Sequence, residues 1–388
     1  MSDVLVARVR ARMQDLDDSG LLRTLRSPSG VDLSSNDYLG LAAHPRLKER
    51  MIDAVARDGA GSTGSRLLRG ERDSFSAIEK RFARLKGTER SLYFSSGYLA
   101  NLAALTTFPE VDDVILSDER NHASLIDGIR LSPARRVIFA HNDVAALRRS
   151  LEETRGGGQR FVVVESLFSM DGDEAPLEAY AALCRAADAH LIVDEAHAVG
   201  IYGAKGSGLV EQHGVGEDMF VSINTAGKAL GVCGAFVAGP AWAIDYMIQR
   251  ARPFIFSTAP PPSVAAALEA SLDIIEEEPE RRAALLERAR TLRTRLVAAG
   301  VPVPAGSSPI VPVLLGDNDR AVAVAAALQA EGFDVRAIRP PTVPPGTARL
   351  RISVNVNLTD DVIERFVGAL ATAISASGLA APMATKAI

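Results

Sequence analysis

The fold is decided by residues 161–197, which read FVVVESLFSMDGDEAPLEAYAALCRAADAHLIVDEAH. This stretch holds two short apolar runs, at 161–164 and 191–193, that are typical of buried strands. Between them, residues 177–189 have the spacing of an amphipathic helix. A strand, a helix and a second strand in this order predict a βαβ unit, whose two strands lie parallel in one sheet.

The same alternation continues on the N-terminal side of this unit. Further strands are predicted at 114–116 and 137–140, and further helices at 124–131 and 144–151. Repeated βαβ units predict an α/β domain, with a mostly parallel sheet and helices on both faces. The chain has 388 residues, which is enough for this domain and a smaller second one.

The last third of the chain predicts a smaller α+β domain. Its expected elements are helices at 279–299, 320–330 and 360–374 and strands at 309–315, 334–337 and 349–354. We therefore predict an N-terminal segment at 1–43, a large cofactor-binding domain at 44–279, a small domain at 280–374 and a flexible tail at 375–388. The N-terminal segment begins with a predicted helix at 3–17, whose apolar stripe is Val4, Val6, Val9 and Met13.

Composition narrows the class of protein. Hydrophobic residues make up 47% and charged residues 23%, an ordinary globular balance, and the net charge of −5 gives no reason to expect nucleic acid or a membrane as partner. Cys184 and Cys233 are the only cysteines, so neither a disulfide framework nor a cysteine-based metal site is expected. Because we find no signal peptide and no apolar run of membrane-spanning length, we predict a cytoplasmic protein without a metal site.

Lys228 is the best candidate for a catalytic lysine. The chain has only six lysines, and Lys228 alone follows a strand-like run, MFVSIN, and lies among small residues in NTAGKALGVCG. Small neighbours let a bulky ligand approach the backbone. The alternative is a solvated loop lysine, since lysine is rarely buried.

Asp194 and His197 follow the apolar run at 191–193, at the predicted carboxyl end of a parallel strand. Ligands bind at this edge of open α/β sheets. An aspartate at this point can pair with a protonated pyridine nitrogen and keep the ring poor in electrons. The alternative is an aspartate that caps the next helix, with His197 packed at its start.

Three further turns follow apolar runs. In YFSSGYLANLAAL, the residues Ser95, Ser96 and Gly97 precede a helical pattern, and backbone N–H groups at a helix start can cradle a phosphate. His122, in DERNHASL, could lie over an aromatic cofactor ring or simply cap a helix. Ser169, in FSMDGD, could donate a hydrogen bond to a ring substituent or form a turn.

A proline-rich loop carries three arginines near the C-terminus. The segment IRPPTVPPGTARLR contains Arg339, Arg349 and Arg351. Arginine side chains bind carboxylates through two parallel hydrogen bonds. Alternate residues of a strand share a face, so Arg349 and Arg351 are expected to point the same way. Surface ion pairing is the alternative for each of them.

Taken in this order, the segments resemble the α-oxoamine synthases, which are fold-type I PLP-dependent transferases. The resemblance runs from SSNDYLGL, at 34–41, to the last predicted helix. It implies that Lys228 holds pyridoxal 5′-phosphate (PLP) as a Schiff base. It also implies an enzyme that condenses an amino acid with an acyl-CoA or acyl-ACP substrate and releases CO₂ and the free thiol.

The family pattern implies a role for each matched residue. Asp194 would pair with the ring nitrogen and His122 would stack on the ring, whereas His197 and Ser169 would contact its 3′-oxygen. Residues implied at the cofactor phosphate are Gly97, Tyr98, Thr225 and, across a homodimer with shared active sites, Ser257 and Thr258 of FSTAPPP. Residues implied near the substrate carboxylate are Asn36, Arg339 and Arg351.

Several segments, among them GSRLLRG, AHND, FSMDGD and FSTAPPP, are most similar to family members that join L-alanine to pimeloyl-CoA or pimeloyl-ACP in biotin synthesis. Two places depart from the family pattern. Ala226 replaces a bulkier residue, and Glu71 and Phe75 replace an uncharged polar residue and a histidine.

Three alternatives remain open. The first is another member of the family that uses glycine or serine with a different acyl thioester. The second is a different PLP reaction on the same fold, such as that of an aldolase or an aminotransferase. The third is a catalytically silent binding protein that keeps the scaffold.

Overall fold

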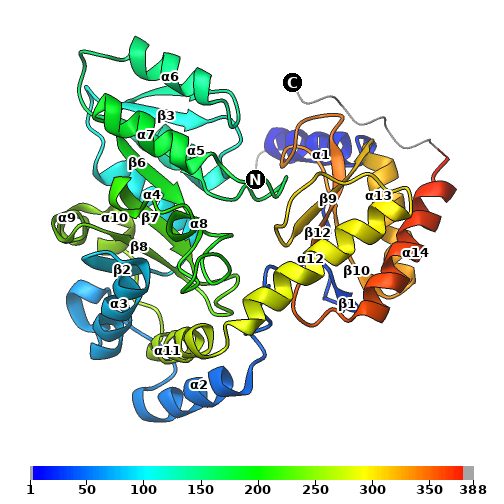
Figure 1. Cartoon of the computed structure of the whole chain (residues 1–388), viewed down its shortest axis with the longest axis horizontal. Coiled ribbons are helices and arrows are strands. Elements are labelled where there is room, and N and C mark those ends of the chain that lie inside the picture. Colours follow the sequence, from blue (N-terminus) through cyan, green and yellow to red (C-terminus); the bar gives the residue numbers. More distant parts are fainter. Residues whose placement is uncertain (1–2, 379–388) are drawn as a thin grey trace. The chain divides into compact units, whose positions relative to one another are not determined.

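A computed structural model describes residues 3–378 of the chain (Figure 1). These residues form two compact units. The sheet unit comprises residues 36–169 and 173–284, and the terminal unit comprises residues 3–35, 170–172 and 285–378. Of the tail predicted at 375–388, residues 379–388 lie outside the described residues.

A seven-stranded sheet forms the centre of the sheet unit. Its strands, in spatial order, are Arg90–Phe94 (β2), Ala235–Gly239 (β8), Met219–Thr225 (β7), His190–Asp194 (β6), Arg160–Glu165 (β5), Val114–Asp118 (β3) and Arg135–Phe139 (β4). Only β8 runs against its neighbours β2 and β7. The prediction of a mostly parallel sheet in an α/β domain is therefore confirmed.

The helices of this unit connect the strands, as the alternating pattern predicts (Figure 1). They are Pro45–Asp58 (α2), Asp73–Lys86 (α3), Gly97–Thr107 (α4), Ala123–Leu131 (α5), Val144–Glu153 (α6), Leu177–Ala187 (α7), Leu209–Gln212 (α8), Ala241–Arg250 (α9), Arg252–Ile255 (α10) and Pro262–Glu277 (α11). A π-helical turn, Arg66–Gly70 (η1), and a 3₁₀ turn, Gly216–Asp218 (η2), complete the set.

Both faces of the central strands β3, β5, β6 and β7 are buried, which explains why these strands are continuous apolar runs, whereas the edge strand β4 is largely exposed. Phe161, Val163 and Ile192 point to one face, where α4, α5, α9 and α10 cover them. Their neighbours in sequence point to the other face, where Phe82 of α3 stacks on Phe236 of β8 with ring centroids 4.0 Å apart. The carboxyl ends of the parallel strands thus meet at one edge of a sheet whose central strands are covered on both faces.

The terminal unit has two small sheets. The strands Ala337–Ile338 (β11), Ala348–Ser353 (β12) and Ile310–Gly316 (β9) are antiparallel, whereas Val31–Asp32 (β1) and Phe333–Asp334 (β10) are parallel. The single strand predicted at 334–337 is wrong in this respect, because residues 333–338 contribute to both sheets. Val335 donates a backbone hydrogen bond to Phe333, which turns the chain between β10 and β11.

The helices of the terminal unit are Asp3–Asp18 (α1), Asn318–Ala330 (α13), Asp360–Ala376 (α14) and the part of Glu280–Ala298 (α12) that follows residue 284. In α1 no side chain is buried, and Val4 of its predicted apolar stripe is 78% exposed. Over residues 3–378, no helix combines the length and the apolar character that crossing a membrane requires.

Candidate active site

The candidate site begins where β5, β6 and β7 end. Glu165 and Asp194 are the last residues of β5 and β6 and are register partners. Because side chains alternate along a strand, Asp194 points to the same face as Ile192, the face covered by α4 and α5. Thr225 ends β7, and Lys228 follows three residues later. The chain thus brings a carboxylate and the candidate lysine to one edge of the sheet.

A hydrogen-bonded chain of four side chains ends at Lys228. His197 Nε2 lies 2.7 Å from Lys228 Nζ, and His197 Nδ1 lies 2.8 Å from the hydroxyl of Tyr38. That hydroxyl lies 3.1 Å from Asn36 Oδ1. Tyr38 is completely buried and His197 is 4% exposed, so most of this hydrogen-bonded series of side chains is shielded from water.

A glycine in the lysine loop explains how Tyr38 comes close to Lys228. Gly231 has a φ of +66°, and a β-carbon at this position would lie 2.6 Å from the backbone nitrogen of Ala42. The loop that carries Lys228 therefore packs directly against the turn at 36–42, which contains Tyr38. Only glycine combines this backbone conformation with so close an approach.

A second chain of hydrogen bonds holds Asp194. Its Oδ1 accepts a bond of 2.8 Å from the backbone N–H of Ala196, and its Oδ2 accepts one of 2.8 Å from Asn101 Nδ2. The Asn101 amide also donates to Ser124 Oγ, which lies 2.7 Å from His122 Nδ1. Helices α4 and α5 thus tie Asp194 to His122.

The surroundings of His122 favour its neutral form and one of its tautomers. Its Nδ1 accepts a hydrogen bond from the backbone N–H of Ser124, so the ring proton lies on Nε2. Burial lowers the pKa of His122, the Asp194 carboxylate opposes this shift, and Lys228 adds to it. As the sequence alternative proposed, His122 also caps α5.

Glu165 is a buried carboxyl that sequence reasoning missed. It accepts hydrogen bonds from the backbone N–H groups of His122 and Ser169, while its Oε1 has no partner among the described residues. Burial, and then the nearby Asp194 carboxylate, raise the pKa of Glu165 well above its usual range, although Lys228 opposes them. Glu165 therefore links the backbones of two candidate cofactor contacts, His122 and Ser169.

The start of α4 has the features of a phosphate cradle. Ser96 caps the helix by accepting a hydrogen bond from Leu99 N–H. A β-carbon on Gly97 would come within 3.4 Å of Thr225 Oγ1, so the glycine keeps the space beside this hydroxyl open. The N–H groups of Gly97 and Tyr98 lie in the first helical turn, where they have no partners within the helix.

Ser257 and Thr258 lie on the same side of the sheet unit as this helix start. Together with Ser95 they line one small cavity, and Thr258 forms an isolated antiparallel bridge with Ser65. Ser257 is half-buried and Thr258 is exposed. The two hydroxyl groups therefore remain accessible within the single chain.

Two of the three residues that depart from the family pattern, Glu71 and Phe75, contact the same arginine. Arg66, in GSRLLRG, lies 2.6 Å from Glu71 and also pairs with Glu79. Its guanidinium lies 5.1 Å from the centre of the Phe75 ring, which is fully buried. Glu71 and Phe75 thus stabilise the GSRLLRG turn through their contacts with Arg66.

Arg349 and Arg351 lie in the terminal unit, on the central strand β12. Both are buried, so surface ion pairing does not describe them. Arg349 pairs with Asp171 at 2.5 Å, and Arg351 donates to Ser353 Oγ at 2.7 Å. They share a face of β12, as the alternation of the strand predicts.

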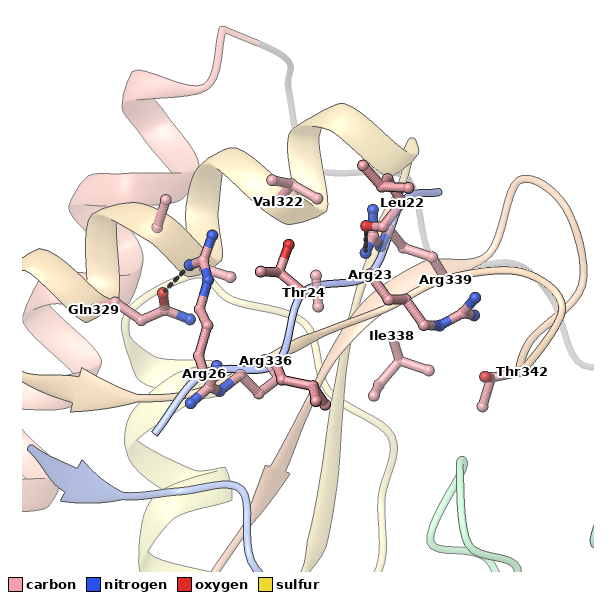
Figure 2. A pocket seen from close by; sticks show the side chains of 14 residues that line it. Leu22, Arg23, Thr24, Arg26, Val322, Gln329, Arg336, Ile338, Arg339 and Thr342 are labelled. Atoms are coloured by element: carbon pink, nitrogen blue, oxygen red, sulfur yellow. Dashed lines mark hydrogen bonds between the residues drawn. The ribbon is translucent and has the colours of Figure 1, made fainter. Parts of the chain in front are cut away.

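Arg339 lines a groove of about 480 Å³ in the terminal unit (Figure 2). Arg23, Arg26 and Arg336 also line it, and no carboxylate does. Ala325 and Ile338 contribute to its apolar lining. Arg339 donates to the backbone carbonyl groups of residues 20 and 22, and Arg26 donates to Gln329 (Figure 2). The groove combines an apolar surface with guanidinium groups, which suits an amphipathic anion.

The residues of the sheet unit fit PLP. The cofactor has a phosphate, an aldehyde, a pyridine nitrogen and a flat ring, and the described side chains offer a partner for each. The helix start at Gly97, the amine of Lys228, the carboxylate of Asp194 and the neutral ring of His122 are these partners. In contrast, no group of His, Cys, Asp and Glu side chains within residues 3–378 is arranged to hold a metal ion.

Known proteins resemble the chain over nearly its whole length. The aminotransferase class I and II family matches residues 28–370. The 8-amino-7-oxononanoate synthase of Geobacter sulfurreducens is 44% identical over 379 residues, which cover 94% of this chain and 97% of that protein. The enzyme of the same name from Chromohalobacter salexigens is 44% identical over 342 residues, 88% of this chain and 89% of that protein.

Solved structures agree with these relatives. Serine palmitoyltransferase from Sphingomonas wittichii superposes with a TM-score of 0.89 at 31% identity and covers 97% of this chain and 98% of its own. A second structure, of a protein abbreviated SPT with PLP bound, also has a TM-score of 0.89 at 31% identity and covers 95% of this chain and 97% of its own. The 8-amino-7-oxononanoate synthase of Francisella tularensis has a TM-score of 0.78 at 28% identity, over 90% and 99%. The chain is therefore a PLP-dependent enzyme of the aminotransferase class I and II family, and within that family it belongs to the α-oxoamine synthases.

Proposed function

We propose that this enzyme condenses L-alanine with a pimeloyl thioester to give 8-amino-7-oxononanoate, CO₂ and the free thiol, a step of biotin biosynthesis. The observation that carries the proposal is the name shared by relatives that are 44% identical over most of the chain. The donor carries its acyl group on CoA or on acyl carrier protein.

The proposed cofactor contacts are those of the sheet unit. Lys228 would hold PLP covalently, Asp194 would keep the ring nitrogen protonated, and His122 would lie on the ring face. Ser169 and His197 would bind its 3′-oxygen, and Gly97, Tyr98 and Thr225 its phosphate. When bound, PLP supplies an electron sink that stabilises a carbanion next to the amino group of the substrate.

Lys228 and His197 are the proposed proton-transferring pair. Their nitrogen atoms lie 2.7 Å apart, so a proton can pass between them without a bridging water molecule. Lys228 would remove the α-proton of the amino acid, and His197 or His122 would polarise the thioester carbonyl. Because both nitrogens of His197 are already engaged, the ring is fixed in position before any substrate arrives.

Asn36, Arg339 and Arg351 are the proposed contacts of the substrate carboxylate. Arg351 is supported by its place on β12, where its guanidinium is buried and donates to Ser353 Oγ. Arg339 is supported by the arginine-rich groove that it lines. Asn36 is supported by its hydrogen bond to Tyr38, which connects Asn36 through His197 to Lys228.

A homodimer with shared active sites is part of the proposal. Ser257 and Thr258 would contribute to the phosphate site of the partner subunit. The single chain leaves Leu67, Leu68 and Phe256 51%, 80% and 70% exposed, and large exposed apolar side chains favour burial against another protein surface. A cytoplasmic location is also proposed, and it is supported by the two free cysteines, Cys184 and Cys233.

A second candidate function is condensation of serine, or of glycine, with a different acyl thioester. It is favoured by the TM-score of 0.89 to serine palmitoyltransferase, compared with 0.78 to the Francisella tularensis enzyme. The two candidates share the residues proposed above and differ in the amino acid and the acyl chain.

An assay of amino acid and thioester combinations distinguishes the two candidate functions. The PLP-loaded enzyme is incubated with L-alanine, L-serine and glycine, each with pimeloyl-CoA, pimeloyl-ACP and palmitoyl-CoA, and the products are identified by mass. The proposal expects 8-amino-7-oxononanoate from L-alanine and a pimeloyl thioester, and no product from the Lys228→Ala variant. A product from serine and palmitoyl-CoA alone would support the second candidate instead.

A further inference from the structure

We propose that Tyr38 is a positioning residue that keeps a proton on Nδ1 of His197, so that the lone pair of His197 Nε2 faces Lys228. The inference rests on the proposed function only where it gives Lys228 and His197 the task of moving a proton. The hydrogen-bond arrangement itself can be tested whatever the acyl donor is.

The tautomer of His197 follows from the number of protons that its hydrogen-bonded neighbours can donate. Tyr38 has a single hydroxyl proton, which it donates to Asn36 Oδ1 over 3.1 Å. With this donor direction the hydroxyl oxygen is the acceptor for His197 Nδ1, 2.8 Å away, and we therefore assign the proton of the neutral ring to Nδ1. In the neutral ring this leaves a lone pair on Nε2, which accepts a hydrogen bond from Lys228 Nζ at 2.7 Å.

The turn that carries Tyr38 is held on several sides. The carboxylate of Asp37 accepts hydrogen bonds from the backbone N–H groups of Leu41 and Ala42, at 2.8 Å and 3.1 Å. Gly231 of the lysine loop packs against the backbone of the same turn. Because Tyr38 is completely buried, its hydroxyl has no route to bulk water and keeps its position relative to His197.

The consequence for chemistry concerns the direction in which His197 can act. With its lone pair on Nε2, the ring can accept a proton from the ammonium form of Lys228, and the N–H group so formed could then donate to the 3′-oxygen of the cofactor or return the proton to Lys228. The opposite tautomer would present an N–H group to Lys228 and could not accept a proton on that side. Fixing a histidine tautomer through the nitrogen that faces away from the reaction is a common role of a second layer of side chains.

The direct test is ¹⁵N NMR of the full-length protein labelled on its histidine rings, both with and without PLP. The chain has only six histidines, so a His197→Gln spectrum assigns the signal. We expect Nδ1 of His197 to have the chemical shift of a protonated nitrogen in the wild type. An unprotonated Nδ1 of His197 in the wild-type protein would overturn the proposal.

The Tyr38→Phe variant supplies the second readout, with Tyr180→Phe as its matched control. Tyr180 is also completely buried, but its hydroxyl has no hydrogen-bond partner among the described residues. Tyr38→Phe should mix the two tautomers of His197 and lower kcat by about 10- to 100-fold with little change in KM, since orientation is lost and binding is not. Tyr180→Phe should leave the His197 signal and kcat unchanged.

The two proposals fail in different ways. If Tyr38→Phe leaves both the tautomer and kcat at wild-type values, the positioning role of Tyr38 is wrong. If the expected tautomer is found but no amino acid and thioester condense, the proposed function fails and the role of Tyr38 in fixing His197 stands.

Discussion

Asn101 donates a hydrogen bond of 2.8 Å to Oδ2 of Asp194 from the second turn of α4. Gly97 lies four residues earlier on the same helix, so the two residues share one face of α4. A single helix thus presents the proposed phosphate cradle at its first turn and orients the proposed partner of the ring nitrogen one turn later. The geometry of α4 sets the distance between these two contacts.

The first prediction concerns this bond. Asn101→Ala removes one of the two hydrogen bonds that hold the Asp194 side chain, so PLP should bind about tenfold more weakly, which corresponds to the loss of one hydrogen bond to a charged group. Titration of the cofactor-free protein with PLP, followed by absorbance, measures the change. Asn224→Ala is the matched control, because Asn224 is equally buried but donates to Ser222. Equal losses in the two variants would contradict a specific role for Asn101.

The second prediction concerns Glu165. Its pKa is raised, so the protonated form is favoured by folding, and the stability that it contributes is lost as pH rises through this raised pKa. Glu165→Gln cannot ionise and should remove this loss, while its amide oxygen still accepts from His122 and Ser169. Urea unfolding of the cofactor-free protein at mildly acidic and mildly alkaline pH should therefore show a smaller decrease for Glu165→Gln than for the wild type.

A control variant separates the charge of Glu165 from its hydrogen bonds. Glu165→Ala also removes the ionisation, but it leaves two backbone N–H groups without an acceptor and should be less stable at every pH. If Glu165→Gln follows the same pH dependence as the wild type, the carboxyl group does not titrate as described.

The third prediction concerns His141, whose ring joins two loops. Its Nδ1 lies 2.9 Å from Asp118 and its Nε2 lies 2.6 Å from Asp173. Although burial opposes the shift, these two carboxylates raise the pKa of His141 to about 9. The stabilisation is therefore fully present below the pKa of an unfolded histidine, about 6.5, and is lost as pH rises through about 9.

His141→Gln should remove this dependence. Its free energy of unfolding should be lower than that of the wild type at neutral pH, and the difference should shrink as pH rises through about 9. Thermal or urea unfolding across this range measures the effect. A difference of constant size between His141→Gln and the wild type across this range would contradict the assignment.

The fourth prediction concerns the ion pair between Lys86 and Glu195. Their side chains are 1% and 0% exposed, their charged atoms lie 2.5 Å apart, and Glu195 directly follows Asp194. Lys86→Met leaves the Glu195 charge buried without its partner and should cost about 3–5 kcal/mol of stability. The double variant Lys86→Met/Glu195→Gln should recover part of this loss, which urea unfolding can measure. No recovery would show that the charge is not the cause.

The sequence predicts the fold well because its strongest signal is local. The apolar runs of β3, β5 and β6 are buried on both faces, and the helices between the strands follow the spacing of the pattern. It fails where the outcome depends on distant partners. The segment at 333–338 divides because β10 pairs with β1 and β11 pairs with β12, and neither partner can be read from the segment itself.

The candidate site is predicted unevenly for the same reason. Lys228, Asp194 and His197 could be singled out because each lies beside a strand end or a glycine-rich turn. Tyr38, Asn101 and Glu165 carry no signal of their own in the sequence, although they lie within SSNDYLGL, YFSSGYLANLAAL and the stretch at 161–197. What makes them part of the site is the direction in which folding points them, and this depends on packing across the sheet unit.

The central claim is that Lys228 holds the cofactor, and one measurement tests it most directly. The PLP-loaded enzyme is reduced with borohydride, digested and analysed by mass spectrometry, which locates the modified residue among the six lysines of the chain. The account predicts a phosphopyridoxyl group on the peptide that contains Lys228 and on no other lysine. Modification of Lys205 or of another lysine, with Lys228 unmodified, would contradict it.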